Sequence, residues 1–424
     1  MTAGPRFPRL DDWLDWQQSL HPNPIDLGLD RVSRVLGRTG WRGPGQPVIT
    51  VGGTNGKGSC VALLDALLRA GGYRVGTFTS PHLVDYRERI RLDGARVSEA
   101  SLVAAFERIA DALEGESLTF FEFNTLAALL VFESWDPDAI VLEVGLGGRL
   151  DAVNIVDADV AIVVSVALDH MEWLGPDLES IGREKAGIFR RARPAVCGMA
   201  EPPKALSDLA EQVGALLLLR GRDFDAVGHA DGRWDFRDAR GQLTRLPAPA
   251  LEGVAQTGNA ATALAALRQL DDRLPLDRAA IESGLAKVRL PGRFQRVSGA
   301  GGIEWVLDVA HNPAAAATLS ANLARHVVSG RTVAVCGMLD DKDVGGVLVA
   351  LRDRMDRWFA ATTAGPRGLA DTALAARARA AGIEMVAAGS VADAMRRAAS
   401  EARAGDRIVV FGSFHTVGPA LACV

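Results

Sequence analysis

Cysteine is scarce in this sequence, and the cysteines present are not paired. The chain of 424 residues contains only four, and no two of them form a Cys-x-x-Cys pattern. They are Cys60, Cys197, Cys336 and Cys423. Disulfide frameworks and structural zinc sites are built from regularly or closely spaced ligands. The sequence therefore predicts neither.

Long apolar runs and an excess of basic residues are lacking as well. No stretch approaches the roughly 18 apolar residues of a membrane-spanning helix, and the first residues, MTAGPRFPRLDDW, contain no apolar segment of the signal-peptide kind. Lysine and arginine number 47 against 52 aspartates and glutamates, a net charge of −5 without a basic stripe. We therefore expect a cytoplasmic protein whose partners are neither membranes nor nucleic acids.

The remaining totals are those of an ordinary soluble protein. Hydrophobic residues make up 48% of the chain and charged residues 23%, which is typical of globular domains. A chain of 424 residues is too long for one ordinary hydrophobic core, so we expect two domains.

Residues 48–59, VITVGGTNGKGS, are the most informative stretch of the chain. Residues 48–51 are β-branched and uncharged, as in a short buried strand, and a glycine-rich turn follows them. Residues 60–70 then carry apolar side chains at helical spacing. A strand, a glycine loop and a helix in that order are the context of a phosphate-binding loop.

The residues of this loop suit a nucleotide and its metal ion. Its glycines let several backbone N–H groups point at one anion, and the helix N-terminus adds a partial positive charge. They are Gly52, Gly53, Gly56 and Gly58. Lys57 would reach the β- and γ-phosphates, and the hydroxyl of Ser59 would bind Mg²⁺. The match to GxxxxGK[ST] is imperfect, because Val51 replaces the first glycine and Gly58 separates the lysine from the serine. A tight turn without a ligand is the alternative, but so many glycines favour the nucleotide.

The pattern of predicted elements indicates two α/β domains. Residues 1–47 predict a short helical preamble, and strands then alternate with helices, which implies a mostly parallel sheet. Strands are expected at 73–79, 139–144, 158–167 and 195–198, helices at 101–113, 125–134, 178–189, 259–270 and 277–286, and a small antiparallel sheet at 224–246.

A break in this pattern at residues 289–293 marks the predicted domain boundary. Alternation restarts after it, with strands expected at 303–309, 332–336, 358–362, 384–387 and 407–411. The predicted fold class is α/β. A P-loop NTPase-type, mostly parallel sheet domain with its preamble spans residues 1–292, and a smaller, Rossmann-like α/β domain spans 293–424.

Polar residues stand at the ends of several predicted strands, where ligands bind in open α/β sheets. Glu143 ends an otherwise apolar strand, and a buried unpaired carboxylate is costly, so it is a candidate Mg²⁺ ligand. His170 follows another strand, although a core or surface histidine is the alternative reading. Asp308 and His311 end the first strand of the second domain and are expected to face a ligand.

Three further segments are ambiguous by themselves. Residues 145–149, GLGGR, could allow close backbone approach after Glu143 or form a flexible turn, and residues 80–83, SPHL, could be a mere turn. Lys185 looks like any solvated lysine of a helix.

Together these motifs resemble one family. Residues 53–59, GTNGKGS, resemble the phosphate loop of the Mur ligase superfamily, including the glycine before the hydroxyl. Other motifs resemble the folylpolyglutamate synthase family, whose bacterial form is a bifunctional dihydrofolate synthase. They are SPHL at 80–83, FEF at 121–123, EVGLGGRLD at 143–151, EKAGI at 184–188, NAATA at 259–263, PGR at 291–293, DVAHNP at 308–313 and GSFH at 412–415.

The resemblance implies an ATP-dependent ligase of folate biosynthesis. In such an enzyme ATP converts a carboxylate to an acyl phosphate, and the amine of L-glutamate attacks it to give an amide, ADP and phosphate. The implied acceptors are dihydropteroate and reduced folates. The implied cofactor is Mg²⁺, with a monovalent cation as an optional addition, and the implied state is a monomer.

The resemblance also implies roles for individual residues. The implied ATP-binding residues are Gly53, Thr54, Asn55, Gly56, Lys57, Gly58, Ser59, Asn259, Arg293 and Asp308. The implied metal ligands are Ser59, Ser80, Glu143 and His170. Lys185 would be carbamylated by CO₂, and His311 would lie near the glutamate. The implied catalytic residues are Lys57, Lys185, His170 and His311. Those bordering the pterin would be Ser80, Pro81, His82, Phe121, Phe123, Asp151, Ala152 and Asn154.

Two rival readings are less well supported. A murein ligase acting on a UDP-linked peptide carries a dedicated domain before the phosphate loop, and only residues 1–47 precede it here. A non-catalytic nucleotide switch would leave Glu143, Lys185 and Asp308 unexplained.

Overall fold

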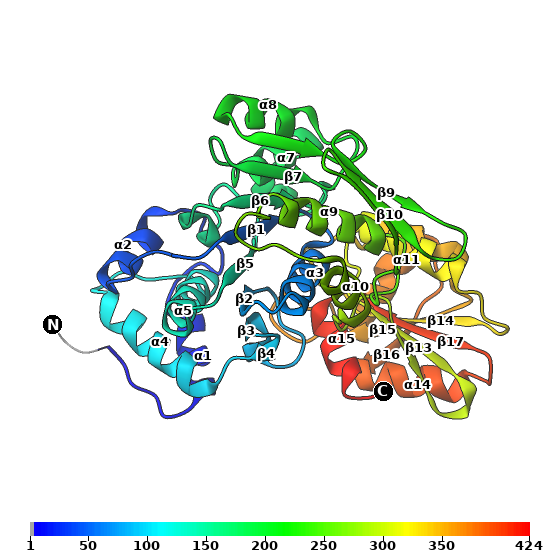
Figure 1. Ribbon diagram of the computed structural model, residues 1–424. Coiled ribbons are helices and arrows are strands. Elements are labelled where there is room, and N and C mark those ends of the chain that lie inside the picture. The colour runs from blue at the N-terminus through cyan, green and yellow to red at the C-terminus, as the bar shows by residue number, and fades with distance from the viewer. Residues whose placement is uncertain (1–3) are drawn as a thin grey trace. The chain divides into compact units, whose positions relative to one another are not determined.

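The chain forms two compact units. A computed structural model describes residues 4–424 (Figure 1). Unit 1 comprises residues 4–81, Tyr86–Pro249 and Thr257–Val288, and unit 2 comprises His82–Asp85, Ala250–Gln256 and Arg289–Val424. Unit 2 thus includes two short segments that a division at residue 292 assigns to the first domain.

The main sheet of unit 1 is mostly parallel, as the sequence predicts. Its strand order is β4-β3-β2-β5-β1-β6-β7-β8. The pairs from β2 to β8 are parallel, and β3 and β4 extend the β2 edge in antiparallel pairing. The strands are β1 (Val48–Gly52), β2 (Val75–Phe78), β3 (Ile90–Leu92), β4 (Ala95–Arg96), β5 (Ala139–Glu143), β6 (Val160–Val163), β7 (Pro194–Cys197) and β8 (Leu216–Leu219).

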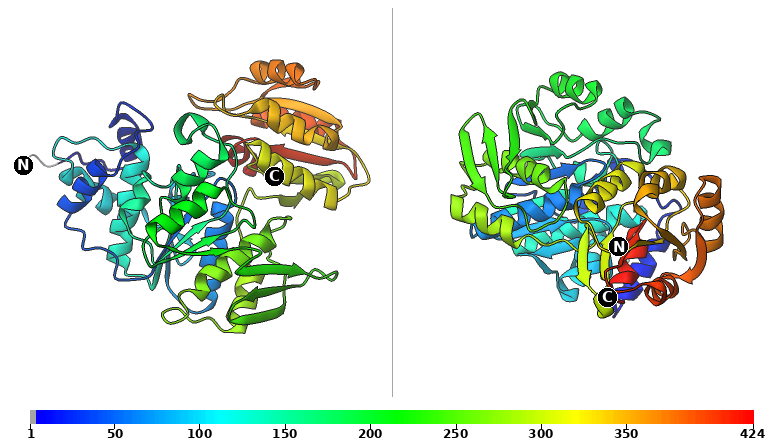
Figure 2. Two further views of the ribbon diagram at one scale, coloured as in Figure 1. Left: turned by 90° about the horizontal axis from the view of Figure 1, so that it is seen from above. Right: turned by 90° about the vertical axis from the view of Figure 1, so that its right-hand side faces the viewer.

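Helices cover this sheet (Figures 1 and 2). They are α1 (Leu10–Ser19), α2 (Asp30–Arg38), α3 (Lys57–Ala70), α4 (Glu99–Ala112), α5 (Phe120–Trp135), α6 (Met171–Leu174), α7 (Leu178–Ala186), α8 (Lys204–Val213), α9 (Gln256–Arg268) and α10 (Arg278–Lys287). The first two confirm the helical preamble and pack on α4 and α5. The α3 helix contacts β1, β2, β5 and α10, and its apolar residues at helical spacing are buried.

A small antiparallel sheet follows β8, which confirms the alternating pattern of residues 224–246. Its strands are β9 (Phe224–Gly228), β10 (Trp234–Asp238) and β11 (Gly241–Leu246), with β10 in the middle. Trp234 and Phe236 are buried, so alternate side chains of β10 form the apolar face of this sheet.

Unit 2 is a Rossmann-like α/β unit. Its strand order is β12-β13-β17-β14-β15-β16, and only the β12 pair is antiparallel. The strands are β12 (Gln295–Ser298), β13 (Glu304–Asp308), β14 (Thr332–Cys336), β15 (Arg357–Thr362), β16 (Val386–Ser390) and β17 (Arg407–Phe411). The helices are α11 (Pro313–Arg325), α12 (Val344–Leu351), α13 (Asp371–Ala380), α14 (Val391–Glu401) and α15 (Phe414–Leu421). Residues of α11, α12 and α13 join one hydrophobic core, and residues of α14 and α15 join another.

Several boundaries differ from the sequence-based expectation. The short strands β3, β4, β8 and β12 were not anticipated, and α3 begins at Lys57 rather than at residue 60. The strand expected at 158–167 ends at Val163, because Ser165 and Ala167 turn to the phosphate loop for their hydrogen bonds. No helix within residues 4–424 is long and apolar enough to cross a membrane.

Candidate nucleotide and metal site

The phosphate loop lies where the central strand of unit 1 ends. β1 lies between β5 and β6, and residues 53–56 connect it to α3. Gly53 has a φ of +143°, and a Cβ at this position would lie 3.1 Å from the backbone N of Ser165. A side chain would therefore push the loop away from the end of β6. The loop lies at the carboxyl edge of the sheet, where such folds bind ligands.

The first turn of α3 is the anion-binding end of the loop. The N–H of Cys60 makes the first helical bond, to the carbonyl of Gly56, with an N···O distance of 2.9 Å. The N–H groups of Lys57, Gly58 and Ser59 precede that bond and have no acceptor within the helix. Together with the helix dipole they form a site for phosphate. The side chain of Asn259 lies beside this turn, with its Oδ1 3.2 Å from the position that a Cβ on Gly56 would occupy.

Two lysines converge on one carbonyl of the loop. Lys57 Nζ donates to the carbonyl oxygens of Gly53 (3.0 Å) and Thr54 (3.3 Å), and Lys185 Nζ donates to the same Gly53 oxygen (3.1 Å). Lys185 is 3% exposed. Burial, and then the charge of Lys57, lower its pKa to about 7. The reading of Lys185 as a solvated helix lysine is therefore wrong.

Two carboxylates oppose this loss of charge on Lys185. Asp169 and Asp151 both favour its protonated form. Asp151 is buried, which raises its own pKa to about 7, although its oxygens accept the N–H groups of Leu146 (2.8 Å) and Val153 (3.1 Å). The charges that shift the pKa of Lys185 thus come from three segments of unit 1: the phosphate loop, residues 145–154 and the Asp169 loop.

Glu143, Ser59 and Ser80 are the oxygen-bearing residues that the sequence predicts as metal ligands. Glu143 ends β5 opposite Val51 of β1, is 5% exposed, and accepts the N–H of Ser80 with an N···O distance of 3.3 Å. Ser59 is buried in the first turn of α3. Burial raises the pKa of the Cys60 thiol to about 12 with a contribution from the charge of Glu143, so this carboxylate acts electrostatically on the start of α3.

His170 belongs to the loop that follows β6. Its backbone N–H donates to Asp169 Oδ1 (3.0 Å), and its Nε2 lies 3.8 Å from the same oxygen. Its backbone is in the left-handed region, with a φ of +51°. The side chain is 30% exposed, which leaves it accessible to a ligand.

The donor types fit a metal ion that is shared with a nucleotide. Within residues 4–424, no group of three or more histidine, cysteine or acidic side chains is arranged to hold a metal by itself. Mg²⁺ is usually held by one or two carboxylates, substrate phosphates and water. Glu143 with the hydroxyls of Ser59 and Ser80 is a donor set of this kind, and His170 is the less typical member.

The residues predicted to border a pterin have diverse surroundings. Phe121 packs on the backbone of Gly145 and on Phe78, with ring centroids 5.8 Å apart. Phe123 is fully buried and packs against Trp16 at 5.7 Å, which favours a role in the core.

Other residues of the same predicted set bond the backbone of their own loop and of the end of α7. Asn154 Nδ2 donates to the carbonyls of Arg149 (2.9 Å) and Gly187 (3.1 Å), and Ala152 is buried in a short 3₁₀ turn. The roles of these residues, and of Ser80, Pro81 and His82, toward a pterin stay predictions. His82 is part of unit 2 rather than unit 1.

Three predicted residues of unit 2 flank the paired strands β12 and β13. Arg293 precedes β12, Asp308 ends β13 and His311 follows it. Asp308 ends β13, and its carboxylate accepts the N–H groups of Phe294 and Ala310, both at 2.8 Å. Burial raises its pKa, while the charges of Arg293 and His311 lower it. The Arg293 guanidinium lies 4.9 Å from the ring centroid of Phe414.

One polar residue of the site escaped the sequence analysis. Ser165 bonds the phosphate loop through both its backbone and its hydroxyl. It lies in a stretch that the apolar pattern predicted as strand, and the only signal was a hydroxyl residue near the end of that strand.

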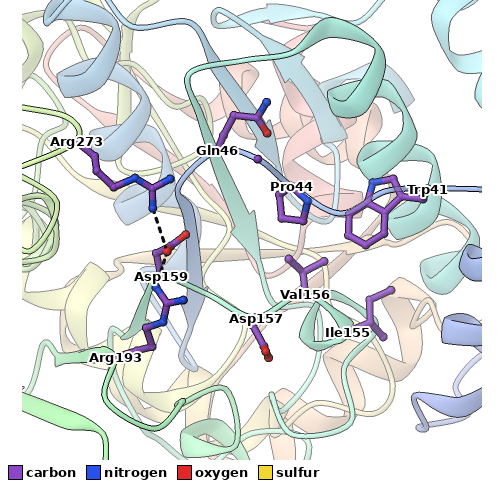
Figure 3. A pocket seen from close by; sticks show the side chains of 10 residues that line it. Trp41, Pro44, Gln46, Ile155, Val156, Asp157, Asp159, Arg193 and Arg273 are labelled. Atoms are coloured by element: carbon purple, nitrogen blue, oxygen red, sulfur yellow. Dashed lines mark hydrogen bonds and ion pairs between the residues drawn. The ribbon is translucent and has the colours of Figure 1, made fainter.

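A cavity of about 380 Å³ lies at the opposite edge of the sheet in unit 1 (Figure 3). Its lining comprises Trp41, Pro44, Gly45, Gln46, Ile155, Val156, Asp157, Asp159, Arg193 and Arg273. All but Arg273 come shortly before β1, β6 or β7, so the cavity is at the amino ends of these strands and away from the phosphate loop. Asp159 joins its walls, since it accepts from Arg193 (2.6 Å), Arg273 (3.1 Å) and the N–H of Val48 (2.9 Å).

Asp159→Ala is expected to lower the free energy of unfolding by about 2 kcal/mol, because three donors lose a largely buried charged acceptor. Asp157→Ala is the matched control, because this side chain is 78% exposed and pairs only with Arg190 among the ion pairs of residues 4–424. Urea unfolding of both variants measures the difference. Equal stability of the two, or a changed KM for ATP in Asp159→Ala, would contradict a purely structural role.

Comparisons with known proteins cover most of the chain. Residues 51–212 match the family described as Mur ligase middle domain, and residues 292–414 match the Mur ligase, glutamate ligase domain. The chain is 47% identical over 412 residues to the dihydrofolate synthase/folylpolyglutamate synthase of Escherichia coli K12, covering 96% of this chain and 94% of that protein.

Solved structures of such enzymes are also similar. "E.coli FolC in complex with DHPP and ADP" superposes with a TM-score of 0.93 at 46% identity, covering 99% of this chain and 98% of that one. A bifunctional folylpolyglutamate synthase/dihydrofolate synthase with Mn, AMPPNP and L-glutamate bound has a TM-score of 0.91 at 43% identity, covering 99% of both chains. The α/β fold with its parallel-dominated sheet is thus shared throughout the chain. This chain belongs to the dihydrofolate synthase/folylpolyglutamate synthase family of Mur ligases and is therefore an acid–amino-acid ligase.

Proposed function

We propose that this chain adds L-glutamate to dihydropteroate, which yields dihydrofolate, and to reduced folates, which extends their glutamate tails. The observation that carries the proposal is the phosphate loop with Lys57, Lys185 and Glu143 near the carboxyl edge of one sheet. Relatives support the substrates, because their structures contain DHPP with ADP, and AMPPNP with L-glutamate and Mn.

The phosphate loop holds the ATP phosphates. The N–H groups of the first turn of α3 bind phosphate oxygens, and Lys57 exchanges the carbonyls of Gly53 and Thr54 for the β- and γ-phosphates. Arg293 and Asp308 of unit 2, together with Asn259, serve the nucleotide, and His311 serves the incoming glutamate.

Ser59 and Glu143, with Ser80 and His170, would hold a divalent metal ion, which is Mg²⁺ in our proposal. Such an ion would supply positive charge that neutralises the phosphates. An additional monovalent cation is compatible with the family resemblance.

The chain contributes positioning and charge rather than a covalent intermediate with its own side chains. An oxygen of the acceptor carboxylate attacks the γ-phosphorus, ADP leaves, and an acyl phosphate forms. The amine of L-glutamate then attacks the carbonyl carbon, the C–O bond to phosphate breaks, and the amine loses a proton. Lys57 stabilises the charge on the transferred phosphoryl group.

Lys185 is the residue that we propose to be carbamylated. Its neutral amine attacks CO₂, which forms an N–C bond and releases one proton. A pKa of about 7 supports this chemistry, because much of the amine is neutral near that pH. The product is an anion where a cation stood, near the metal ligands proposed above.

The proposed activity is tested by measuring phosphate release and product mass with Mg-ATP, L-glutamate and either dihydropteroate or tetrahydrofolate. We expect release that requires glutamate and an acceptor, stops with EDTA, and adds one glutamate to dihydropteroate. Turnover with tetrahydrofolate alone would indicate a dedicated polyglutamylating enzyme. ATP binding without any acceptor-dependent turnover would favour the nucleotide switch.

We further propose that the protein acts as a monomer in the cytoplasm. The family resemblance and the character of its small-molecule ligands support this. Sedimentation at micromolar concentration would reveal any larger assembly.

A further inference from the structure

Two hydroxyls tie the phosphate loop to the loop that follows β6, and they do so reciprocally. Thr54 Oγ1 accepts the N–H of Ala167 (3.0 Å) and donates to its carbonyl (3.2 Å). Ser165 Oγ accepts the N–H of Asn55 (3.0 Å) and donates to its carbonyl (2.8 Å). Each hydroxyl thus holds both backbone groups of one residue on the other loop. We call these four bonds the hydroxyl lock.

The hydroxyl lock begins where the sheet pairing stops. The N–H of Val164 still donates to Gly52 (2.9 Å), and the N–H of Thr54 donates to the carbonyl of Ser165 (2.8 Å). Beyond that point the two segments have no ladder, because β1 and β6 have ended. Side-chain hydroxyls replace the backbone bonds that a longer strand pair would supply.

The bonds of the lock orient the peptide groups on both sides. The N–H groups of Thr54 and Asn55 are both bound to Ser165. The peptide planes leading into Gly56 and α3 are therefore fixed, and with them the direction of the first-turn N–H groups. On the other loop Ala167 is fixed two residues before Asp169, which acts on Lys185 and bonds the N–H of His170.

We propose that Thr54 and Ser165 are positioning residues that hold the phosphate loop and the Asp169–His170 loop in one fixed arrangement for ATP. This gives the Thr54 side chain a role in the loop's geometry instead of a direct contact with the nucleotide. The inference deepens the proposed function and rests on it for the identity of the ligand.

The test compares variants that remove a hydroxyl with variants that keep it. Thr54→Val and Ser165→Ala remove one hydroxyl each, and Thr54→Ser and Ser165→Thr retain it. Thr50→Val is the matched control, because the Thr50 hydroxyl is buried in β1 and has no hydrogen-bond partner within residues 4–424. For each protein we would measure the Kd of AMPPNP by calorimetry, KM and kcat for every substrate, and the melting temperature.

We expect Thr54→Val and Ser165→Ala each to raise the Kd of AMPPNP and the KM for ATP about tenfold, since each loses two hydrogen bonds that orient the loop. The KM for L-glutamate should stay within about twofold, as should every constant of Thr54→Ser, Ser165→Thr and Thr50→Val. The double variant should lose less than the product of the single losses, because both hydroxyls hold the same pair of loops.

A lowered melting temperature with unchanged AMPPNP affinity and ATP KM would overturn the proposal, since the lock would then only stabilise the fold. Equal losses in Thr50→Val would also overturn it. If Ser165→Ala does not fold, the results for Thr54→Val, on the other loop, decide whether the proposal holds. AMPPNP binding needs no acceptor, so this outcome is separate from failure of the ligase assay.

Discussion

Lys57→Ala is expected to lower kcat/KM for ATP by about 10³, because it removes the one lysine of the phosphate loop from a site where charge develops on the transferred phosphoryl group. The ammonium is already directed into this loop by the carbonyls of Gly53 and Thr54. Steady-state kinetics with dihydropteroate and L-glutamate measures the loss.

The control for this prediction is Lys204, a lysine outside the candidate site. Lys204 pairs with Asp208 on the surface and its side chain is 80% exposed, so Lys204→Ala should keep wild-type kinetics. Loss of Lys57 should also raise the pKa of Lys185, because the Lys57 charge is one cause of its depression. A decrease of less than about fivefold in Lys57→Ala would contradict the assigned role.

Lys185→Ala is expected to lower kcat by about 10², because it removes both the carbamate and its support of the metal site. Wild-type enzyme depleted of CO₂ should lose activity and regain it when bicarbonate is added. The variant should not respond to bicarbonate. A ¹³C carbamate signal from labelled bicarbonate, present in the wild type and absent in the variant, measures the modification directly.

The pH dependence of this modification follows from the direction of the pKa shift. Only the neutral amine reacts with CO₂. With a pKa of about 7, about half of Lys185 is neutral at pH 7, whereas an ordinary lysine is neutral in roughly one molecule in 3,000. At fixed dissolved CO₂ the carbamylated fraction should therefore rise with pH through 7 and fall below it. Activity that is independent of both CO₂ and Lys185 would disprove the carbamate.

The stability of the ligand-free protein shows whether Lys185→Ala loses activity only because it unfolds. The lowered pKa of the buried Lys185 means that its protonated form destabilises the folded state. This cost is largest below pH 7, where the amine is protonated in both the folded and the unfolded states. It fades as pH rises toward the ordinary pKa of 10.5. Lys185→Ala should therefore unfold no more readily than the wild type at pH 6.

Much of the fold was predictable because its signals are local. The apolar residues of β1 and β5, the glycines of the phosphate loop and the helical spacing of α3 each depend on neighbours in the chain. The edge strands β3 and β4 were missed, because Ile90–Leu92 and Ala95–Arg96 are very short and contain arginines. β3 exists because β2 offers an open edge to pair with, and β4 in turn pairs with β3.

The candidate site was predictable as a set of residues but not as an arrangement. The sequence alone determined the phosphate loop, the acidic strand end at Glu143 and the family resemblance, since backbone freedom and residue chemistry are properties of the chain itself. The tertiary structure decided that Lys185 is buried beside Lys57, that Asp151 and Asn154 bond their own loop, and that Thr54 and Ser165 face each other's backbone. Burial, charge and hydrogen-bond partners depend on segments more than 100 residues apart in the chain, such as the loop at Thr54 and the end of β6, and only folding brings these segments together.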